Sequence, residues 1–170
     1  MMPAARRGLE ALETSLNLLS AAILFFLMFY VTAEVAMRYL FNAPLAGHLE
    51  ATQLLIAPAV FLALSWVQAR RGHVGMDLLH ERLSPRARAA VDIVTLAIAL
   101  ATFLAITWFS WASAVEAWEI GDVTPTANLQ TWWSKLSVPL GCALLCVRLL
   151  MQLVESLVVA VSPGSGRWTP

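Results

Sequence analysis

The stretch Thr14–Ala33, TSLNLLSAAILFFLMFYVTA, contains twenty consecutive residues without a charged side chain. About 20 apolar residues in a helix are enough to cross the ~30 Å hydrocarbon core of a bilayer. Because lipid offers the backbone no hydrogen-bond partner, a continuous apolar run in a membrane must form a helix. The run also lacks the alternation of a barrel strand. It therefore predicts a membrane-spanning helix.

Three more apolar runs follow along the chain. Ala51–Ala69 and Ile93–Val115 carry no charge, and Leu136–Val161 carries only Arg148 and Glu155. The chain is 59% hydrophobic and 13% charged, too little charge to cover a soluble domain of 170 residues. We expect one all-α integral membrane domain over residues 1–170. Its four transmembrane helices are predicted at about 14–38, 49–69, 85–117 and 134–161.

The first run could instead belong to a secretory signal, because Arg6 and Arg7 precede it. Its apolar part is longer than the usual core of such a signal. We therefore expect the run to remain as a spanning helix.

Basic residues are unevenly distributed among the connections. Loops on the cytoplasmic side of a membrane are enriched in Lys and Arg. We expect both termini and the middle connection in the cytoplasm, an N-in/C-in arrangement. The arginines that favour it are Arg6 and Arg7 before the first span, Arg70, Arg71, Arg82, Arg86 and Arg88 between the second and third spans, and Arg167 at the end.

The middle connection has the pattern of an amphipathic helix over about 76–84. A helix with one apolar face can lie in the membrane interface; a solvated linker with chance periodicity is the alternative. The apolar stripe is Met76, Leu79 and Leu83, and the polar stripe is Asp77, His80 and Glu81.

Aromatic residues lie near the predicted span ends. Tryptophan is enriched where a membrane meets water. We expect Trp118, Trp132 and Trp133 to anchor the outer boundary and Trp66 the inner one. Cys142 and Cys146, four residues apart on one helix face, are interpreted as small packing residues.

Two groups of charged residues lie in or beside the spans. Glu34 and Arg38 have the i, i+4 spacing of a helical ion pair, which we interpret as a surface pair at the end of the first span. Arg148 lies inside the fourth span, where a charge is costly and indicates a functional site. It could extend toward the cytoplasmic headgroups, or it could pair with an acid of a partner protein.

The sequence argues against several functional classes. The formal net charge is zero, so no nucleic-acid partner is expected. A phosphate-binding Gly-Lys loop and a nucleophile–base arrangement are both missing from the sequence. We predict no catalytic, cofactor or metal site, and no enzyme.

Short motifs at four helix ends occur in a recognisable order. Together they resemble the small membrane subunit of tripartite ATP-independent periplasmic (TRAP) transporters, the DctQ-like family, over about residues 10–158. Many members of that family carry a Trp and paired acids at the start of the second span, where this chain has the single acid Glu50. The motifs are RYLFNAPL at 38–45, Glu50, GHVGMDLL at 72–79, GDVT at 121–124, Trp132, Lys135 and VPLG at 138–141.

The resemblance implies a small permease subunit in a bacterial inner membrane. In such systems a periplasmic solute-binding protein (DctP-like) captures the solute. A large membrane subunit (DctM-like) then carries it with sodium, without ATP. The small subunit packs against the stationary part of the large one as a scaffold. The solute implied is an organic acid or another small molecule.

Seven residues are candidates for subunit contacts or for loop geometry. Those that match family motifs could serve either role, or could only cap helices within this chain. Motif positions supply Arg38, Asn42, Glu50, His73 and Asp77, and the fourth span adds Pro139 and Arg148.

Two other functions remain as alternatives. A small proton-coupled multidrug exporter also has four spans and needs an acid in the first, for which Glu34 is the candidate. Glu34 lies beside Arg38, which would hold it ionised. The other alternative is a structural four-span membrane protein.

Overall fold

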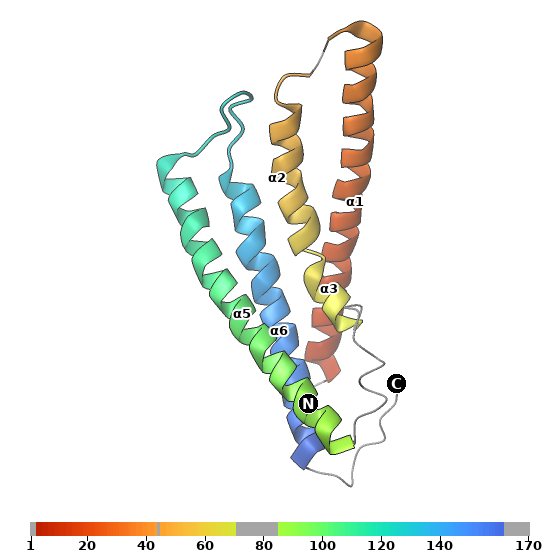
Figure 1. Cartoon of the computed structure of the whole chain (residues 1–170), viewed down its shortest axis with the longest axis vertical. Helices are drawn as coiled ribbons and strands as arrows, with labels where there is room; N and C mark the ends of the chain where they lie inside the picture. Colours follow the sequence, from red (N-terminus) through yellow and green to blue (C-terminus); the bar gives the residue numbers. More distant parts are fainter. Residues whose placement is uncertain (1–2, 44, 71–84, 162–170) are drawn as a thin grey trace.

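The computed structural model describes residues 3–43, 45–70 and 85–161, and almost all of them are helical (Figure 1). Four segments are long and apolar enough to cross a membrane: Arg7–Phe41, His48–Ala69, Ala90–Ile120 and Trp132–Leu157. The predicted all-α, four-span fold is thus confirmed, while the predicted interfacial helix at 76–84 lies outside the described residues. The helices are α1 (Pro3–Phe41), α2 (His48–Phe61), α3 (Leu64–Ala69), α5 (Pro85–Ile120) and α6 (Trp132–Val161).

The four spans form a row in the order α5, α6, α2 with α3, and α1 (Figure 1). Helix α6 packs against α5 on one side and against α2 and α3 on the other, and α1 packs against α2 and α3. We call the end where α1 begins and α6 ends the terminal end. The opposite end, with the connections 42–47 and 121–131, is the loop end.

Helix α6 supplies the centre of this row. Cys142, Leu145, Cys146 and Leu149 are all at most 4% exposed. Both cysteines are free thiols and act as small packing residues, as their spacing predicted. Small side chains let neighbouring helices approach closely, which is how membrane helices associate without a hydrophobic driving force.

The second span is a broken helix, because α2 ends at Phe61 and α3 begins at Leu64. Pro58 lies one turn before the break and has no N–H to give the carbonyl of Leu54. The hydroxyl of Ser134 on α6 donates to that carbonyl at 2.7 Å. A neighbouring helix thus replaces the hydrogen bond that proline removes.

The break also exposes backbone oxygens to α1 and α6. The hydroxyl of Ser20 on α1 donates to the carbonyl of Ala59. On the other side, Gly141 of α6 lies directly against the carbonyl of Phe61, and any β-carbon there would overlap that oxygen. The break is therefore fixed by contacts from both neighbouring helices.

Candidate functional site

A buried polar cluster joins three helices near the terminal end. Glu13 of α1 is 1% exposed, and its Oε1 accepts a hydrogen bond from the hydroxyl of Ser65 on α3 at 2.6 Å. Nη1 of Arg148 on α6 lies 3.8 Å from Oε2 of Glu13. We call Glu13, Ser65 and Arg148 the terminal-end layer. Removing a charge from water is costly unless an opposite charge or a hydrogen-bond partner lies beside it, and the three groups of this layer supply such partners to one another.

Arg148 is held inside the chain. Its Nη2 donates to the carbonyl of Ala69 at 3.4 Å, and its side chain is 8% exposed. Nε has no hydrogen-bond partner in the described part of the chain. From the sequence we expected Arg148 to extend toward the headgroups or to pair with an acid of a partner protein. In the structure it lies beside Glu13, an acid of the same chain. Sequence reasoning missed Glu13.

Further polar contacts lie beside this layer. The side-chain amide of Gln68 donates to Oε1 of Gln152 at 2.8 Å, and the amide of Gln152 donates to the carbonyl of Gln68 at 3.2 Å. The guanidinium of Arg70 lies 4.4 Å from the ring centroid of Trp66. These contacts join α3 and α6 and place Trp66 at the terminal end.

A second cluster lies at the loop end. Glu34 of α1 is 2% exposed, and its Oε1 accepts a hydrogen bond from Nε of Arg38 at 3.0 Å. Nδ1 of His48 on α2 lies 3.0 Å from the carbonyl oxygen of Leu45, and Nε2 lies 3.3 Å from Nη2 of Arg38. Since a carbonyl only accepts, the contact with Leu45 places a hydrogen on Nδ1 of His48. We call Glu34, Arg38 and His48 the loop-end layer.

Glu50, near the start of α2, holds the connection between α5 and α6. Its carboxylate oxygens accept hydrogen bonds from the backbone N–H groups of Thr126, at 2.9 Å, and Ala127, at 2.8 Å. Gly47, with φ 76°, lies so close to Ala127 that a β-carbon would collide with it. A single acid thus ties two connections of the chain together, and both of its oxygens are used.

The connection 121–131 is a compact turn. Gly121 and Asn128 adopt left-handed φ values of 68° and 52°. An isolated antiparallel bridge joins Val123 and Gln130. The N–H of Thr124 donates to the carbonyl of Leu129 at 2.9 Å. These contacts present the amides of residues 126 and 127 to Glu50.

Asp122 fixes the base of this turn. Its Oδ2 accepts hydrogen bonds from Nζ of Lys135 and from the hydroxyl of Thr131, both at 2.8 Å. The hydrogen bond from Lys135, followed by that from Thr131, holds the pKa of the Asp122 carboxyl below its usual range. The GDVT motif at 121–124 therefore contains two residues that shape the turn.

Other predicted residues occupy structural positions. Asn42 follows the last residue of α1 with φ 50°, and the N–H of Ala43 donates to the carbonyl of Met37 at 3.2 Å, closing the helix end. Pro139 is fully buried within α6. The Trp118 and Trp132 rings meet edge to face, 4.6 Å between centroids. Trp133 is 37% exposed.

The structure brings together only part of the predicted set. His73 and Asp77 lie outside the described residues. Arg38, Asn42 and Glu50 gather at the loop end, whereas Arg148 lies near the terminal end. The residues that sequence reasoning missed are Glu13, Ser65 and the backbone of Thr126 and Ala127. An acid one residue before the first uncharged run is a signal that could have indicated Glu13, because its helix must place it at a membrane boundary.

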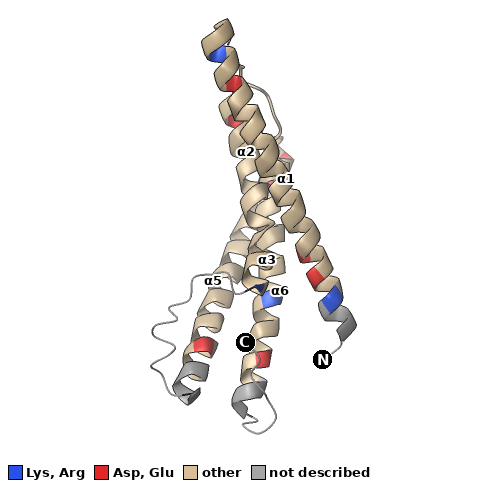
Figure 2. Ribbon diagram, turned by 90° about the vertical axis from the view of Figure 1, so that its right-hand side faces the viewer, with Lys and Arg blue, Asp and Glu red and all other residues tan. Residues whose placement is uncertain are grey.

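Charged residues gather toward the two ends of the molecule, with an uncharged zone between them (Figure 2). Every polar contact described above that involves a charged side chain belongs to one of these two ends. The arrangement can hold helices in register across a membrane. Among the described residues, no charged side chain lies in the zone between the two ends (Figure 2).

Comparison with known proteins agrees with the motif pattern. Residues 27–159 match the family model described as the DctQ component of tripartite ATP-independent periplasmic transporters. The chain is also similar to the C4-dicarboxylate TRAP transporter small permease protein DctQ of Vibrio cholerae serotype O1 (strain ATCC 39315 / El Tor Inaba N16961). The two are 30% identical over an aligned length of 140 residues, which covers 69% of this chain and 60% of the relative. With four spanning helices and a family match over most of its length, the chain is a multi-pass inner-membrane protein that belongs to the DctQ family of TRAP transporter subunits.

Proposed function

We propose that this chain is the small scaffold subunit of a sodium-coupled TRAP transporter and moves no solute itself. A larger permease subunit carries the solute, and a periplasmic solute-binding protein delivers it. The small subunit holds the stationary part of the larger one in position. Family membership supports this assignment.

The observation that carries the proposal is the uncharged zone between the two polar layers. Residues 14–33, 51–69 and 93–115 contain no charged side chain, and Arg148 of α6 belongs to the terminal-end layer. Transporters bind solute and coupling ions near the bilayer midplane, where broken helices present polar groups. The one broken span here has its freed carbonyls at Leu54 and Ala59 satisfied by serines of its own chain. Serine hydroxyls of the two neighbouring helices therefore occupy both of these carbonyls.

The exporter alternative is disfavoured by the position of Glu34. A proton-coupled exporter needs an acid that binds and releases protons within a substrate path. Glu34 lies in the loop-end layer, in contact with Arg38 and His48. The carboxylate of Glu34 is thus already engaged by two side chains of its own chain.

The solute class follows from the relative. That protein is named for C4-dicarboxylates, so we propose an organic acid or a similar small solute for the transporter that contains this chain. Sodium coupling is proposed from the family resemblance alone. We further propose that the terminal end lies in the cytoplasm and the loop end in the periplasm, because arginines concentrate toward the terminal end in the sequence.

Reconstitution tests the proposed function. Liposomes would contain this chain alone, the larger permease subunit with the binding protein, or all three components. We expect uptake of a labelled C4-dicarboxylate, or of another acid from a panel, only with all three and only with an inward sodium gradient. Uptake by this chain alone would refute the scaffold role.

A further inference from the structure

One face of α5 is exposed over most of its length and borders α6 only near Trp118, whose ring meets that of Trp132. Most of the α5 surface is exposed, and one series of exposed residues on it has alternating steps of three and four, the spacing of a left-handed helix–helix seam. Helix α5 packs against α6 through another face, where Ala114 and Ala117 are buried. We call the exposed series the α5 stripe: Ala101, Leu104, Trp108, Trp111, Val115 and Trp118.

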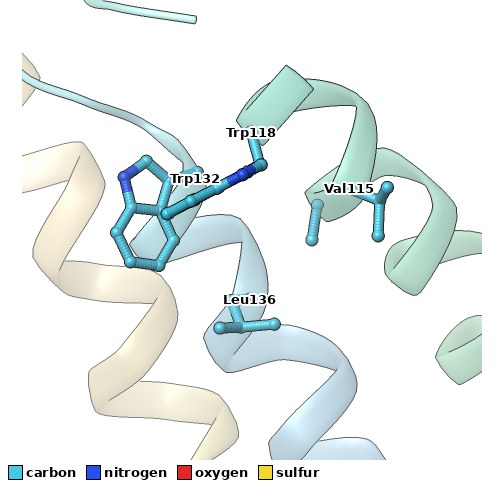
Figure 3. A pocket seen from close by; sticks show the side chains of 5 residues that line it. Val115, Trp118, Trp132 and Leu136 are labelled. Atoms are coloured by element: carbon cyan, nitrogen blue, oxygen red, sulfur yellow. The ribbon is translucent and has the colours of Figure 1, made fainter. Parts of the chain in front are cut away.

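At the loop end, the stripe borders a groove between α5 and α6 (Figure 3). The groove has a volume of about 280 Å³, and Val115 and Trp118 of α5 line it together with Trp132 and Leu136 of α6. Drug-sized ligands generally occupy pockets of ~300–1,000 Å³. This groove is below that range, open and apolar, and suits a side chain inserted from a neighbouring helix.

The depth of Trp108 and Trp111 argues that protein rather than lipid covers the stripe. The uncharged part of α5 runs between Asp92 and Glu116, with its middle at Leu104. Trp108 therefore lies ~6 Å from mid-depth and Trp111 ~10 Å, at a rise of ~1.5 Å per residue. Both positions fall inside a hydrocarbon core with a half-thickness of ~15 Å.

A tryptophan side chain that faces lipid at this depth is energetically unfavourable. Its indole N–H needs a hydrogen-bond acceptor, so exposed tryptophans gather at the membrane interface. Trp108 is 76% exposed and Trp111 is 53% exposed. Within the described residues neither indole donates a hydrogen bond. A hydrogen-bond acceptor on another protein would satisfy these indole N–H groups.

The opposite edge of the row provides a contrast. Phe26 and Met28 of α1 are each 55% exposed, near the middle of the span between Glu13 and Glu34. Neither side chain has a polar hydrogen that requires a partner, so lipid satisfies both. At the depth of Trp108 the α1 edge therefore exposes side chains without a polar hydrogen, and Tyr30, farther from the middle, is only partly exposed.

We propose that a membrane-spanning helix of the larger permease subunit packs along the α5 stripe. An apolar side chain of that helix is seated in the groove, and its polar groups accept hydrogen bonds from Trp108 and Trp111. This inference rests on the proposed function. It adds that the α5 edge, and not the α1 edge, forms the subunit contact.

Two measurements on the co-expressed complex test this assignment. First, the photo-crosslinking residue p-benzoylphenylalanine replaces Trp108 or, as the matched control of similar depth and exposure, Phe26. Second, the chain with W108A and W111A is tagged and the retained larger subunit is quantified, beside a control with F26A and M28A. We expect the larger subunit to crosslink at position 108 and not at 26. Loss of two interfacial tryptophans should reduce its retention at least about tenfold.

The outcomes separate the two proposals. The α5 variants should leave the melting temperature of the isolated chain unchanged, since Trp108 and Trp111 face away from the packed side of α5; this excludes misfolding as the cause of lost retention. Crosslinking at position 108 to lipid or to a second copy of this chain, with the larger subunit still retained, overturns the inference. So does crosslinking of the larger subunit at position 26 alone. If the unmodified chain retains no larger subunit, the proposed function itself fails.

Discussion

Glu13 and Glu34 lie 21 residues apart on α1, and each is buried beside a basic side chain. At ~1.5 Å per residue their separation along the helix is ~31 Å, which matches the ~30 Å hydrocarbon core of a bilayer. Glu13 pairs with Arg148 of α6, and Glu34 contacts Arg38 and, from α2, His48. The two acids thus have the spacing expected of residues at the two boundaries of a membrane.

Removing one partner of the Glu13–Arg148 pair should destabilise the chain. E13Q or R148M alone leaves the other charge buried, which typically costs about 3–5 kcal/mol. The double variant E13Q/R148M should recover most of the loss, because Nε of Arg148 has no hydrogen-bond partner among the described residues and the pair is incompletely satisfied. Thermal unfolding of the purified chain measures all three. Equal loss in the double variant and the single variants would contradict this coupling.

Substitution of Glu50 should release the connection 121–131. E50Q removes the charge and leaves a single oxygen to accept hydrogen bonds from two amides. Hydrogen bonds to a charged group are worth about 1.5–3 kcal/mol, so this loss should be measurable. We expect faster hydrogen exchange at the amides of Thr126 and Ala127. E119Q, at an exposed position on α5, should leave both amides as protected as before.

A methyl group at Gly141 should be poorly tolerated. G141A places a β-carbon on the carbonyl oxygen of Phe61, so α6 must move away from the break between α2 and α3. The matched control is G8A, because a β-carbon at Gly8 of α1 meets no other atom within 4 Å. G8A should be neutral, or stabilising by up to ~1 kcal/mol through helix propensity. A melting temperature that falls for G141A and not for G8A is the expected result.

Because Ser134 supplies the hydrogen bond that Pro58 cannot, the effect of a substitution at Ser134 should depend on the residue at position 58. S134A leaves the Leu54 carbonyl without a donor, which should cost about 1–3 kcal/mol. In a P58A background the new N–H at position 58 can donate to Leu54, so S134A should then cost less. Unfolding of the four chains gives this difference, and equal costs in both backgrounds would show that Ser134 does not serve the proline.

The turn at Asp122 should depend on pH. The pKa of the Asp122 carboxyl is lowered in the folded chain, so the ionised carboxylate stabilises the fold. This stabilisation is fully present above the ordinary carboxyl pKa and is lost as the pH falls through the lowered pKa. Hydrogen exchange at Thr131, whose N–H donates to the carbonyl of Asp122, should increase below about pH 4. D122N should remove this acid dependence and show weaker protection at neutral pH.

The four spans could be predicted because the bilayer imposes a length and a composition on each. Thr14–Ala33 and Ile93–Val115 satisfy both requirements from sequence alone. The partner of Arg148 could not be predicted in this way, because Glu13 is 135 residues away in sequence and spacing carries no information on which helices are neighbours. The same holds for Glu50, whose ligands are backbone amides of another connection. Local spacing did suffice for Glu34 and Arg38, which lie on consecutive turns of one helix.

The complete burial of Cys142 and near-complete burial of Cys146 within α6 has a practical consequence for labelling. Thiol reagents act on the exposed, ionised form of cysteine, and neither residue offers it to water. A membrane-impermeant maleimide should therefore leave the natural chain unmodified. Single cysteines introduced at the two ends could then show which end faces the periplasm in intact cells, without replacement of Cys142 and Cys146.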